Sequence, residues 1–216
     1  LIVTKNGVNI KKYNAIFNHL FSHVSSLKKR SDQGENWWNL RACSYYDEFE
    51  KEKLIYPETT VRRGEFYIDT EKYFIDKTCF MIIGENLKYL NAILSSKLME
   101  WYLESELRLL GKNTIQYSKQ FIENLPIPDM FNKGLQPLAL GSSQPAVLSE
   151  NKQTYDKLVS LVDNMLETQK LYHNAKSDSD KNLYKQKIDL IDNQIDDLVY
   201  KLYGLTEDEI KIVEGG

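Results

Sequence analysis

Three charged residues near the middle of the chain could form a magnesium-dependent nuclease site. Asp129 follows Pro128, and after a gap of twenty residues Glu150-Asn151-Lys152 completes the outline Pro-Asp…Glu-x-Lys. In that motif two carboxylates hold the metal and the lysine polarises the attacking water. The chemistry needs the second carboxylate and the lysine on a strand, whereas the gap is rich in Gly, Pro and Ser and Glu150 opens a helical pattern. Such short motifs also arise by chance, so a nuclease stays an alternative only.

Other catalytic chemistries find no matching residues in the sequence. No Gly-rich turn follows a strand pattern to bind a nucleotide or S-adenosylmethionine, and no Asn-Pro-Pro-aromatic tetrapeptide could hold a target adenine. His19 and His23 lie one helical turn apart without further metal ligands at suitable spacing. Cys43 and Cys79 are too few for a disulfide framework or a zinc site. We predict no catalytic residue, no metal site and no cofactor in this chain.

Polar and basic side chains in two loops could instead read DNA bases. Asn and Gln can pair with adenine, Arg can pair with guanine, and Thr and Ser can bond to bases or phosphates. One loop follows Gly111, where a glycine permits close backbone approach, and the other is a turn between two strand patterns next to Gly64. Solvated loop charge and a helix N-cap are the alternative interpretations. The candidate contacts are Arg62, Arg63, Lys112, Asn113, Thr114, Gln116, Tyr117 and Lys119.

A second group of cations could position a duplex through its phosphates. Lys28, Lys29 and Arg30 end a helical pattern, and Arg41 lies in the stretch from Trp37 to Pro57, which holds six aromatic side chains and three cations. Lysine and arginine contacts to phosphates set the register on DNA without reading its sequence. Alternatively, the charges cap a helix and face solvent while the rings form core.

The apolar pattern predicts an α+β protein with a curved, mostly antiparallel sheet and packed helices. A short strand at the N-terminus precedes one helix up to residue 30. Short strand patterns with turn signals between them follow at 54–56, 65–68, 73–75 and 78–83. A core helix opens at 84–86 and stops before Gly111, with its apolar face formed by Leu87, Leu90, Ile93, Leu94, Leu98 and Trp101.

Two long helical patterns at the C-terminal end predict an antiparallel hairpin. Apolar residues recur at alternating spacings of three and four in both patterns, and the turn at 177–180 carries residues suited to capping the second helix. Gly204 is a natural helix stop. The narrow seam favours either an intramolecular support or a partner interface.

Three motifs then carry a family resemblance. They are Trp-x-Leu-Arg-x-Cys at 38–43, Phe-Glu-Lys-x-Lys-Leu-Ile-Tyr-Pro at 49–57 and Glu-Asn-Leu-Pro-Ile-Pro at 123–128. In these segments the chain resembles the C-terminal target-recognition domain, or TaqI-like specificity domain, of bifunctional type IIG restriction-modification enzymes, which is related in plan to type I specificity subunits. Residues 191–206 look like the ending common in the same enzymes.

The resemblance implies sequence-specific recognition of double-stranded DNA by a noncatalytic domain. The chain starts without methionine, and the resemblance implies that an adenine-specific DNA methyltransferase domain, preceded by an endonuclease domain, comes before it in the parent protein. S-adenosylmethionine and Mg are expected only in those domains, and the methyltransferase domain is an expected partner. The domains expected are an N-terminal strand and linker helix (1–30), the target-recognition domain (31–128), a linker (129–150) and the hairpin (151–216).

Charge and hydropathy limit the remaining possibilities. The net charge is −3, but residues 1–128 hold 18 Lys and Arg against 16 Asp and Glu, whereas residues 129–216 hold 10 against 15. The small basic excess therefore lies in the half that carries the motifs. No signal peptide or apolar span is visible, which predicts no membrane partner and a location in the bacterial cytoplasm. The rival hypothesis is a protein-interaction module that uses the hairpin, including for self-association.

Overall fold

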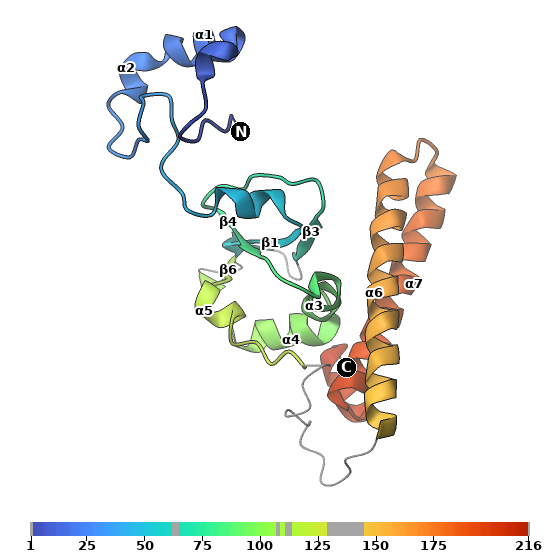
Figure 1. Cartoon of the computed structure of the whole chain (residues 1–216). Coiled ribbons are helices and arrows are strands. Elements are labelled where there is room, and N and C mark those ends of the chain that lie inside the picture. Colours follow the sequence, from blue (N-terminus) through green and yellow to red (C-terminus); the bar gives the residue numbers. More distant parts are fainter. Residues whose placement is uncertain (1, 62–64, 107–108, 111–113, 129–144, 216) are drawn as a thin grey trace. The chain divides into compact units, whose positions relative to one another are not determined.

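The computed structural model describes residues 2–61, 65–106, 109–110, 114–128 and 145–215, with the backbone alone described at 109–110 and 145–151. These residues form two compact units, Leu1–Glu50 and Lys51–Gly216, which we call the N-terminal unit and the main unit. Figure 1 shows helices combined with short strands in antiparallel sheets. The predicted α+β class is therefore confirmed.

Short helices provide the regular structure of the N-terminal unit. They are η1 (Ile10–Lys12), α1 (Asn14–Ser22), α2 (Val24–Leu27) and η2 (Tyr46–Glu50). We predicted one helix in place of α1 and α2, but the backbone at His23 leaves helical geometry, with φ −105° and ψ 11°. The predicted N-terminal strand does not form among residues 2–4, which are described as irregular.

A buried amide organises the loop that follows α2. The side chain of Asn39 is fully buried, donates from Nδ2 to Thr4 O at 3.0 Å and accepts from Asn36 N at 2.8 Å. The guanidinium of Arg30 donates through Nη2 to the carbonyls of Trp37 (2.9 Å) and Asn39 (2.8 Å). Because buried polar groups are costly unless they are bonded, this network favours one conformation of the loop.

Sheet A is the larger antiparallel sheet of the main unit. Its strands are β1 (Lys53–Pro57), β3 (Tyr67–Asp69) and β4 (Cys79–Ile82), in the order β3-β1-β4. Leu54 and Tyr56 alternate along the central strand and are 0% and 3% exposed. Since alternate side chains share one face of a strand, this face of the sheet belongs to the core.

An ion pair is buried at one end of sheet A. Lys53 on β1 lies opposite Asp69 on β3, and their side chains pair with no solvent exposure. The carboxylate of Asp69 also accepts hydrogen bonds from the backbone N–H groups of Glu71 (2.9 Å) and Tyr73 (2.8 Å). These bonds turn the chain directly after β3, which explains why the strand that we predicted at 73–75 does not form.

A second, smaller sheet is joined to the first through Glu58. Sheet B consists of β2 (Thr59–Thr60), β6 (Thr114–Gln116) and β5 (Leu109–Leu110), in the order β2-β6-β5. The N–H of Glu58 donates to Thr78 O at 2.8 Å, and its carbonyl accepts from Tyr117 N at 2.9 Å. The antiparallel pairing that we predicted is therefore present, divided between two sheets.

The helix predicted after β4 is two helices, α3 (Leu87–Leu94) and α4 (Lys97–Glu106). Ser96 separates them, because its Oγ donates to Ile93 O at 2.7 Å and accepts from Met99 N at 3.3 Å. Ile93 and Met99 are buried, whereas Trp101 is 39% exposed and lies outside the core. A short helix, α5 (Lys119–Ile122), begins after the N-cap Ser118.

The predicted helical hairpin is confirmed. Helices α6 (Pro145–Asn174) and α7 (Asp178–Tyr203) are antiparallel, and α8 (Glu207–Val213) follows them. Ser177 caps α7 through a bond to Asp180 N, and Gly204 ends it with a φ of 70°. Six residues of the expected linker, 145–150, are helical, while 129–144 lie outside the described residues.

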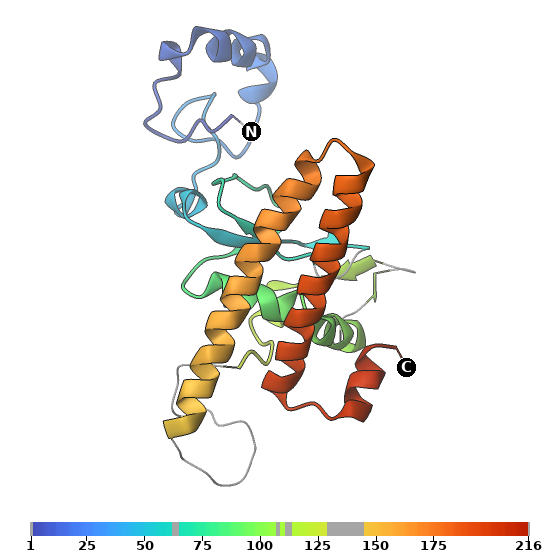
Figure 2. The same ribbon diagram turned by 90° about the vertical axis from the view of Figure 1, so that its right-hand side faces the viewer.

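Helix α3 packs between sheet A and the hairpin, which covers one side of the main unit in Figure 2. Polar contacts accompany the apolar packing. Tyr155 Oη donates to Asn86 Oδ1 at 2.7 Å, and Lys88 pairs with Asp163 at 2.6 Å. The backbone N–H of Lys97 donates to the buried carboxylate of Asp196 at 2.9 Å. The hairpin is therefore part of the main unit's core.

We predict that Lys53→Met destabilises the main unit strongly. The substitution leaves the Asp69 carboxylate buried without its cation, so the free energy of unfolding should fall by about 3–5 kcal/mol. Urea unfolding followed by circular dichroism measures this change. The matched control is Lys77→Met, because Lys77 is exposed and such surface changes stay within about 0.5 kcal/mol. Equal effects of both variants would contradict a structural role for the ion pair.

Asp192 on α7 should make stability depend on pH. Asp192 is exposed on the surface of α7, but the neighbouring protein displaces part of the water around its carboxyl group. This desolvation, together with the carboxylates of Asp196 and Asp189, raises the pKa of Asp192 to about 6 from 3.8. The folded state therefore holds this proton more tightly than the unfolded state does. The stabilisation is complete below the ordinary pKa and is lost as pH rises through about 4 to 6.

Asp192→Asn should accordingly flatten the decline of unfolding free energy across that pH range and raise stability at pH 7. Urea unfolding at several pH values measures both effects. Asp197→Asn removes another exposed carboxylate of the same helix, so it is the matched control and should retain the wild-type decline. The same slope in Asp192→Asn as in the wild type would contradict the assignment.

Candidate nucleic-acid interface

The register of sheet B brings two predicted contact segments to the same end of the sheet. Thr60 is the last residue of β2 and pairs with Ile115, while Thr114 is the first residue of β6 and pairs with Leu110. In an antiparallel pair, the chain leaving one strand adjoins the chain entering the other. The segment that follows Thr60 and the segment that precedes Thr114 are therefore attached to neighbouring positions of sheet B.

A side-chain hydrogen bond closes the base of the segment that follows β2. Thr60 Oγ1 donates to Glu65 Oε2 at 2.7 Å. This bond joins the two described ends of the segment that carries Arg62 and Arg63. Those arginines, together with Lys112 and Asn113, lie outside the described residues, so the predictions for them remain predictions.

The other residues predicted in the second loop belong to β6 and α5. Thr114 and Gln116 are half-buried strand residues, and Gln116 pairs with Thr59. Lys119 is exposed and forms an ion pair with Glu123 at 3.3 Å. Most of the described part of this segment is therefore sheet and helix, although the sequence suggested a continuous polar loop.

Tyr117 was predicted to contact DNA, but its position in the structure does not allow this. It is 0% exposed, and its ring lies 5.8 Å from that of Phe66 and 6.4 Å from that of Tyr56. A fully buried ring cannot contact a DNA base directly, so we assign Tyr117 to the core that supports the interface. The side-chain polarity of a tyrosine gives no local signal that separates these two roles.

The predicted phosphate contacts of the N-terminal unit have different environments. Lys28 and Lys29 are exposed. Arg30 is half-buried, and besides its bonds through Nη2 it donates from Nε to Leu27 O at 3.2 Å. Arg41 is exposed and lies 3.4 Å from a carboxylate oxygen of Asp32. Lys28 and Lys29 therefore match a phosphate-contacting role best, while Arg30 also has a structural one.

The nuclease alternative gains no support from the described residues. Asp129 lies outside them, and Glu150 and Lys152 fall within helix α6 instead of on a strand. Lys152 is exposed and lies 3.8 Å from the carboxylate of Asp156, one helical turn along α6. Across the described part of the chain, no three His, Cys, Asp or Glu side chains gather as a metal site would require.

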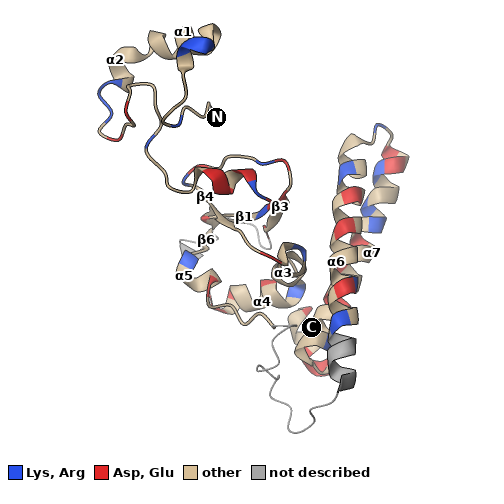
Figure 3. Ribbon diagram, viewed as in Figure 1, with Lys and Arg blue, Asp and Glu red and all other residues tan. Residues whose placement is uncertain are grey.

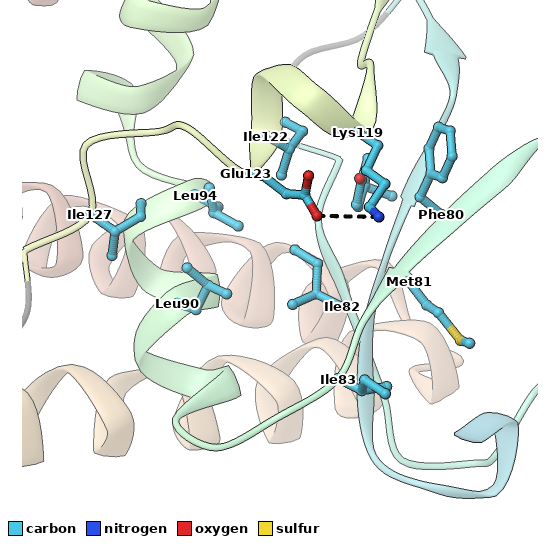
Figure 4. A pocket seen from close by; sticks show the side chains of 11 residues that line it. Phe80, Met81, Ile82, Ile83, Leu90, Leu94, Lys119, Ile122, Glu123 and Ile127 are labelled. Atoms are coloured by element: carbon cyan, nitrogen blue, oxygen red, sulfur yellow. Dashed lines mark ion pairs between the residues drawn. The ribbon is translucent and has the colours of Figure 1, made fainter. Parts of the chain in front are cut away.

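A cavity of about 410 Å³, which was not predicted from the sequence, lies beside the edge strand β4. Figure 4 shows apolar side chains around it, with the Lys119–Glu123 ion pair at one side. Burial, with Glu123 nearby, raises the pKa of the lining Tyr56 to about 12. The sequence contains one signal for this cavity, the unbroken apolar run 80–83. A strand with one face in the core needs apolar residues only at alternate positions, so an unbroken run indicates that the second face also meets apolar surroundings. The other lining residues are Phe80, Met81, Ile82, Ile83, Leu90, Leu94, Ile122 and Ile127.

Comparison with known families identifies the chain. The profile of the TaqI-like C-terminal specificity domain matches residues 3–127, which is more than half of the 216 residues. The chain therefore belongs to this family, as the motifs at 38–43, 49–57 and 123–128 indicated. No curated protein sequence matches the chain.

Family membership supports a DNA target-recognition role in restriction-modification. The matched region includes the N-terminal unit from residue 3 onward and both sheets, and the helical hairpin lies beyond it. No described helix has the length and apolarity needed to cross a membrane.

We predict that Tyr117→Ala lowers the free energy of unfolding by about 3–5 kcal/mol, as truncation of a buried ring does. Tyr67→Ala is the matched control, because Tyr67 on β3 is 53% exposed. Thermal and urea unfolding measure both variants. A Tyr117→Ala protein of wild-type stability that had lost DNA binding would return Tyr117 to the list of contacts.

Proposed function

We propose that this chain recognises a specific sequence in double-stranded DNA and has no catalytic site of its own. It would act as the specificity domain of a bifunctional restriction endonuclease and adenine-specific DNA methyltransferase. The observation that carries the proposal is the register of sheet B. It places Thr60 and Thr114 at the same end of the sheet, where the chain continues into the segments that contain Arg62, Arg63, Lys112 and Asn113. Loops held by a rigid scaffold are the usual place for binding residues.

The proposed mechanism divides the contacts between bases and phosphates. Arg62, Arg63, Asn113 and Gln116 would read base edges in the major groove. The cations Lys28, Lys29, Arg41, Lys112 and Lys119 would bind phosphates and set the register. Methylation and cleavage would occur in other domains of the parent protein, which would bind S-adenosylmethionine and Mg. Such an enzyme would work in the bacterial cytoplasm.

The hairpin supports a second proposed role, as the surface that docks the methyltransferase domain or a second copy of the chain. Leu183 and Leu190 are 60% and 58% exposed and lie two helical turns apart on α7, and Leu171 on α6 is 40% exposed. Exposed leucines on one side of a helix favour a partner. Sedimentation of the chain with Leu183→Ser and Leu190→Ser would test self-association.

Selection from random duplex DNA tests the DNA-reading function. The chain is incubated with the duplex pool at moderate salt, and the retained molecules are sequenced. We expect enrichment of one short motif. Retention without enrichment would mean phosphate binding alone and would contradict sequence-specific recognition. Absence of retention, with the chain folded, would favour the interaction module.

Two variants should then separate the base contacts from the phosphate contacts. Gln116→Ala should relax the preference at one position of the motif by about 1–3 kcal/mol. Lys28→Ala should weaken binding to all sequences and reduce the slope of log affinity against log salt by roughly one. Lys170→Ala, at an exposed lysine on α6, is the control and should change neither quantity. Fluorescence anisotropy with matched and mismatched duplexes measures all three.

A further inference from the structure

The first 31 residues are strongly basic, in contrast to the chain as a whole. They contain six Lys and Arg and no Asp or Glu, whereas the net charge of the protein is −3. Figure 3 shows no acidic residue on α1 or α2, and the first red segment follows them in the loop. Lys11, Lys12, Lys28 and Lys29 are exposed, while Lys5 pairs with Asp47 at 3.1 Å. The N-terminal unit as a whole, residues 1–50, holds seven Lys and Arg against five Asp and Glu, and its carboxylates all follow residue 31. The positive charge is therefore concentrated in the first 31 residues, which favours a polyanionic partner there.

Aromatic side chains of the same unit form a connected cluster that includes an exposed ring. Phe17 and Phe21 of α1 are stacked with ring centroids 5.8 Å apart, and each lies 6.2 Å from Trp37. Trp37 in turn lies 5.3 Å from Trp38. Phe21 is nevertheless 56% exposed, and neither α1 nor α2 contains a buried residue. Tyr13, which directly precedes α1, is 55% exposed.

Hydrogen bonds connect this aromatic cluster to the basic turn after α2. Arg30 Nη2 donates to the carbonyl of Trp37, and Gln33 Nε2 donates to the carbonyls of Lys28 (3.0 Å) and Arg30 (2.7 Å). The turn 28–30 therefore lies beside Trp37, and Trp37 contacts Phe21. Cations and an exposed ring are thus held in one small structure.

We propose that the N-terminal unit binds single-stranded nucleic acid, with a base stacked on Phe21 and the backbone held by the lysines. Proteins that bind single strands combine a basic surface with rings that stack on unpaired bases. Two other polyanions fit less well. A DNA duplex could pair with the lysines, but its bases are stacked and paired and cannot stack on Phe21. An acidic protein surface could also pair with the lysines, but it has no base to stack on the ring. This inference is independent of sheet B and holds whether or not the chain reads a duplex sequence.

The test measures binding of the full chain to a fluorescein-labelled oligo(dT) of about 12 nucleotides. We expect binding that weakens with salt and quenches tryptophan fluorescence, because Trp37 adjoins the stacking ring. Phe21→Ala should weaken it roughly tenfold or more, as expected for loss of one stacked base. The affinity for duplex DNA should change much less. Tyr67→Ala removes an equally exposed ring from β3 of the main unit and should leave oligo(dT) binding unchanged.

Phe21→Leu provides a second variant that keeps apolar volume on α1. It should fold as the wild type does by circular dichroism and still lose the stacking contribution. Competition with heparin, a polyanion without bases, separates charge from stacking. Wild-type oligo(dT) affinity in folded Phe21→Leu and Phe21→Ala proteins would overturn the proposal. Absence of oligo(dT) binding by the wild type, or a loss shared by Tyr67→Ala, would overturn it as well.

Discussion

The buried ion pair between Lys53 and Asp69 is the constraint on which sheet A depends. Two opposite charges without solvent are tolerated only while they face each other, since either one alone would be far more costly. A slip of one residue between β1 and β3 would separate the charges and turn the apolar side chains of β1 outward. The pair therefore fixes which residues of β1 enter the core, and Leu54 and Tyr56 are the result.

The position of sheet B follows from that of β1. Glu58 is the single residue between β1 and β2, and its backbone bonds to Thr78 on one side and Tyr117 on the other. Sheet B therefore cannot shift without breaking bonds to sheet A. The core therefore fixes the positions at which the chain leaves β2 after Thr60 and enters β6 at Thr114, and connections held by such a scaffold can vary in sequence without changing the core.

The sequence predicted well those features that depend on neighbouring residues. The hairpin, the cap at Ser177 and the stop at Gly204 follow from helical periodicity and capping chemistry, which are local. Features that depend on distant contacts were not predictable. Nothing near Lys53 indicates that its charge is buried, and Tyr117 lies in a polar segment although its ring packs in the core. The breaks at His23 and Ser96 were missed because apolar spacing continues through them, and only the backbone geometry and the bonds of Ser96 separate the helices.

Local charge explains how a protein with a net charge of −3 can belong to a family of DNA-specificity domains. Association with DNA depends on the cations near the phosphates, because salt screens interactions beyond about 10 Å. The acidic excess lies in residues 129–216, a range that includes the hairpin, whereas the charged residues among the first 31 are all cations. A helix without buried residues also needs a partner or a fixed neighbour to remain ordered, since short helices are marginal in water. The aromatic contacts with Trp37 supply the neighbour for α1, and the ring that remains exposed is left available for a ligand.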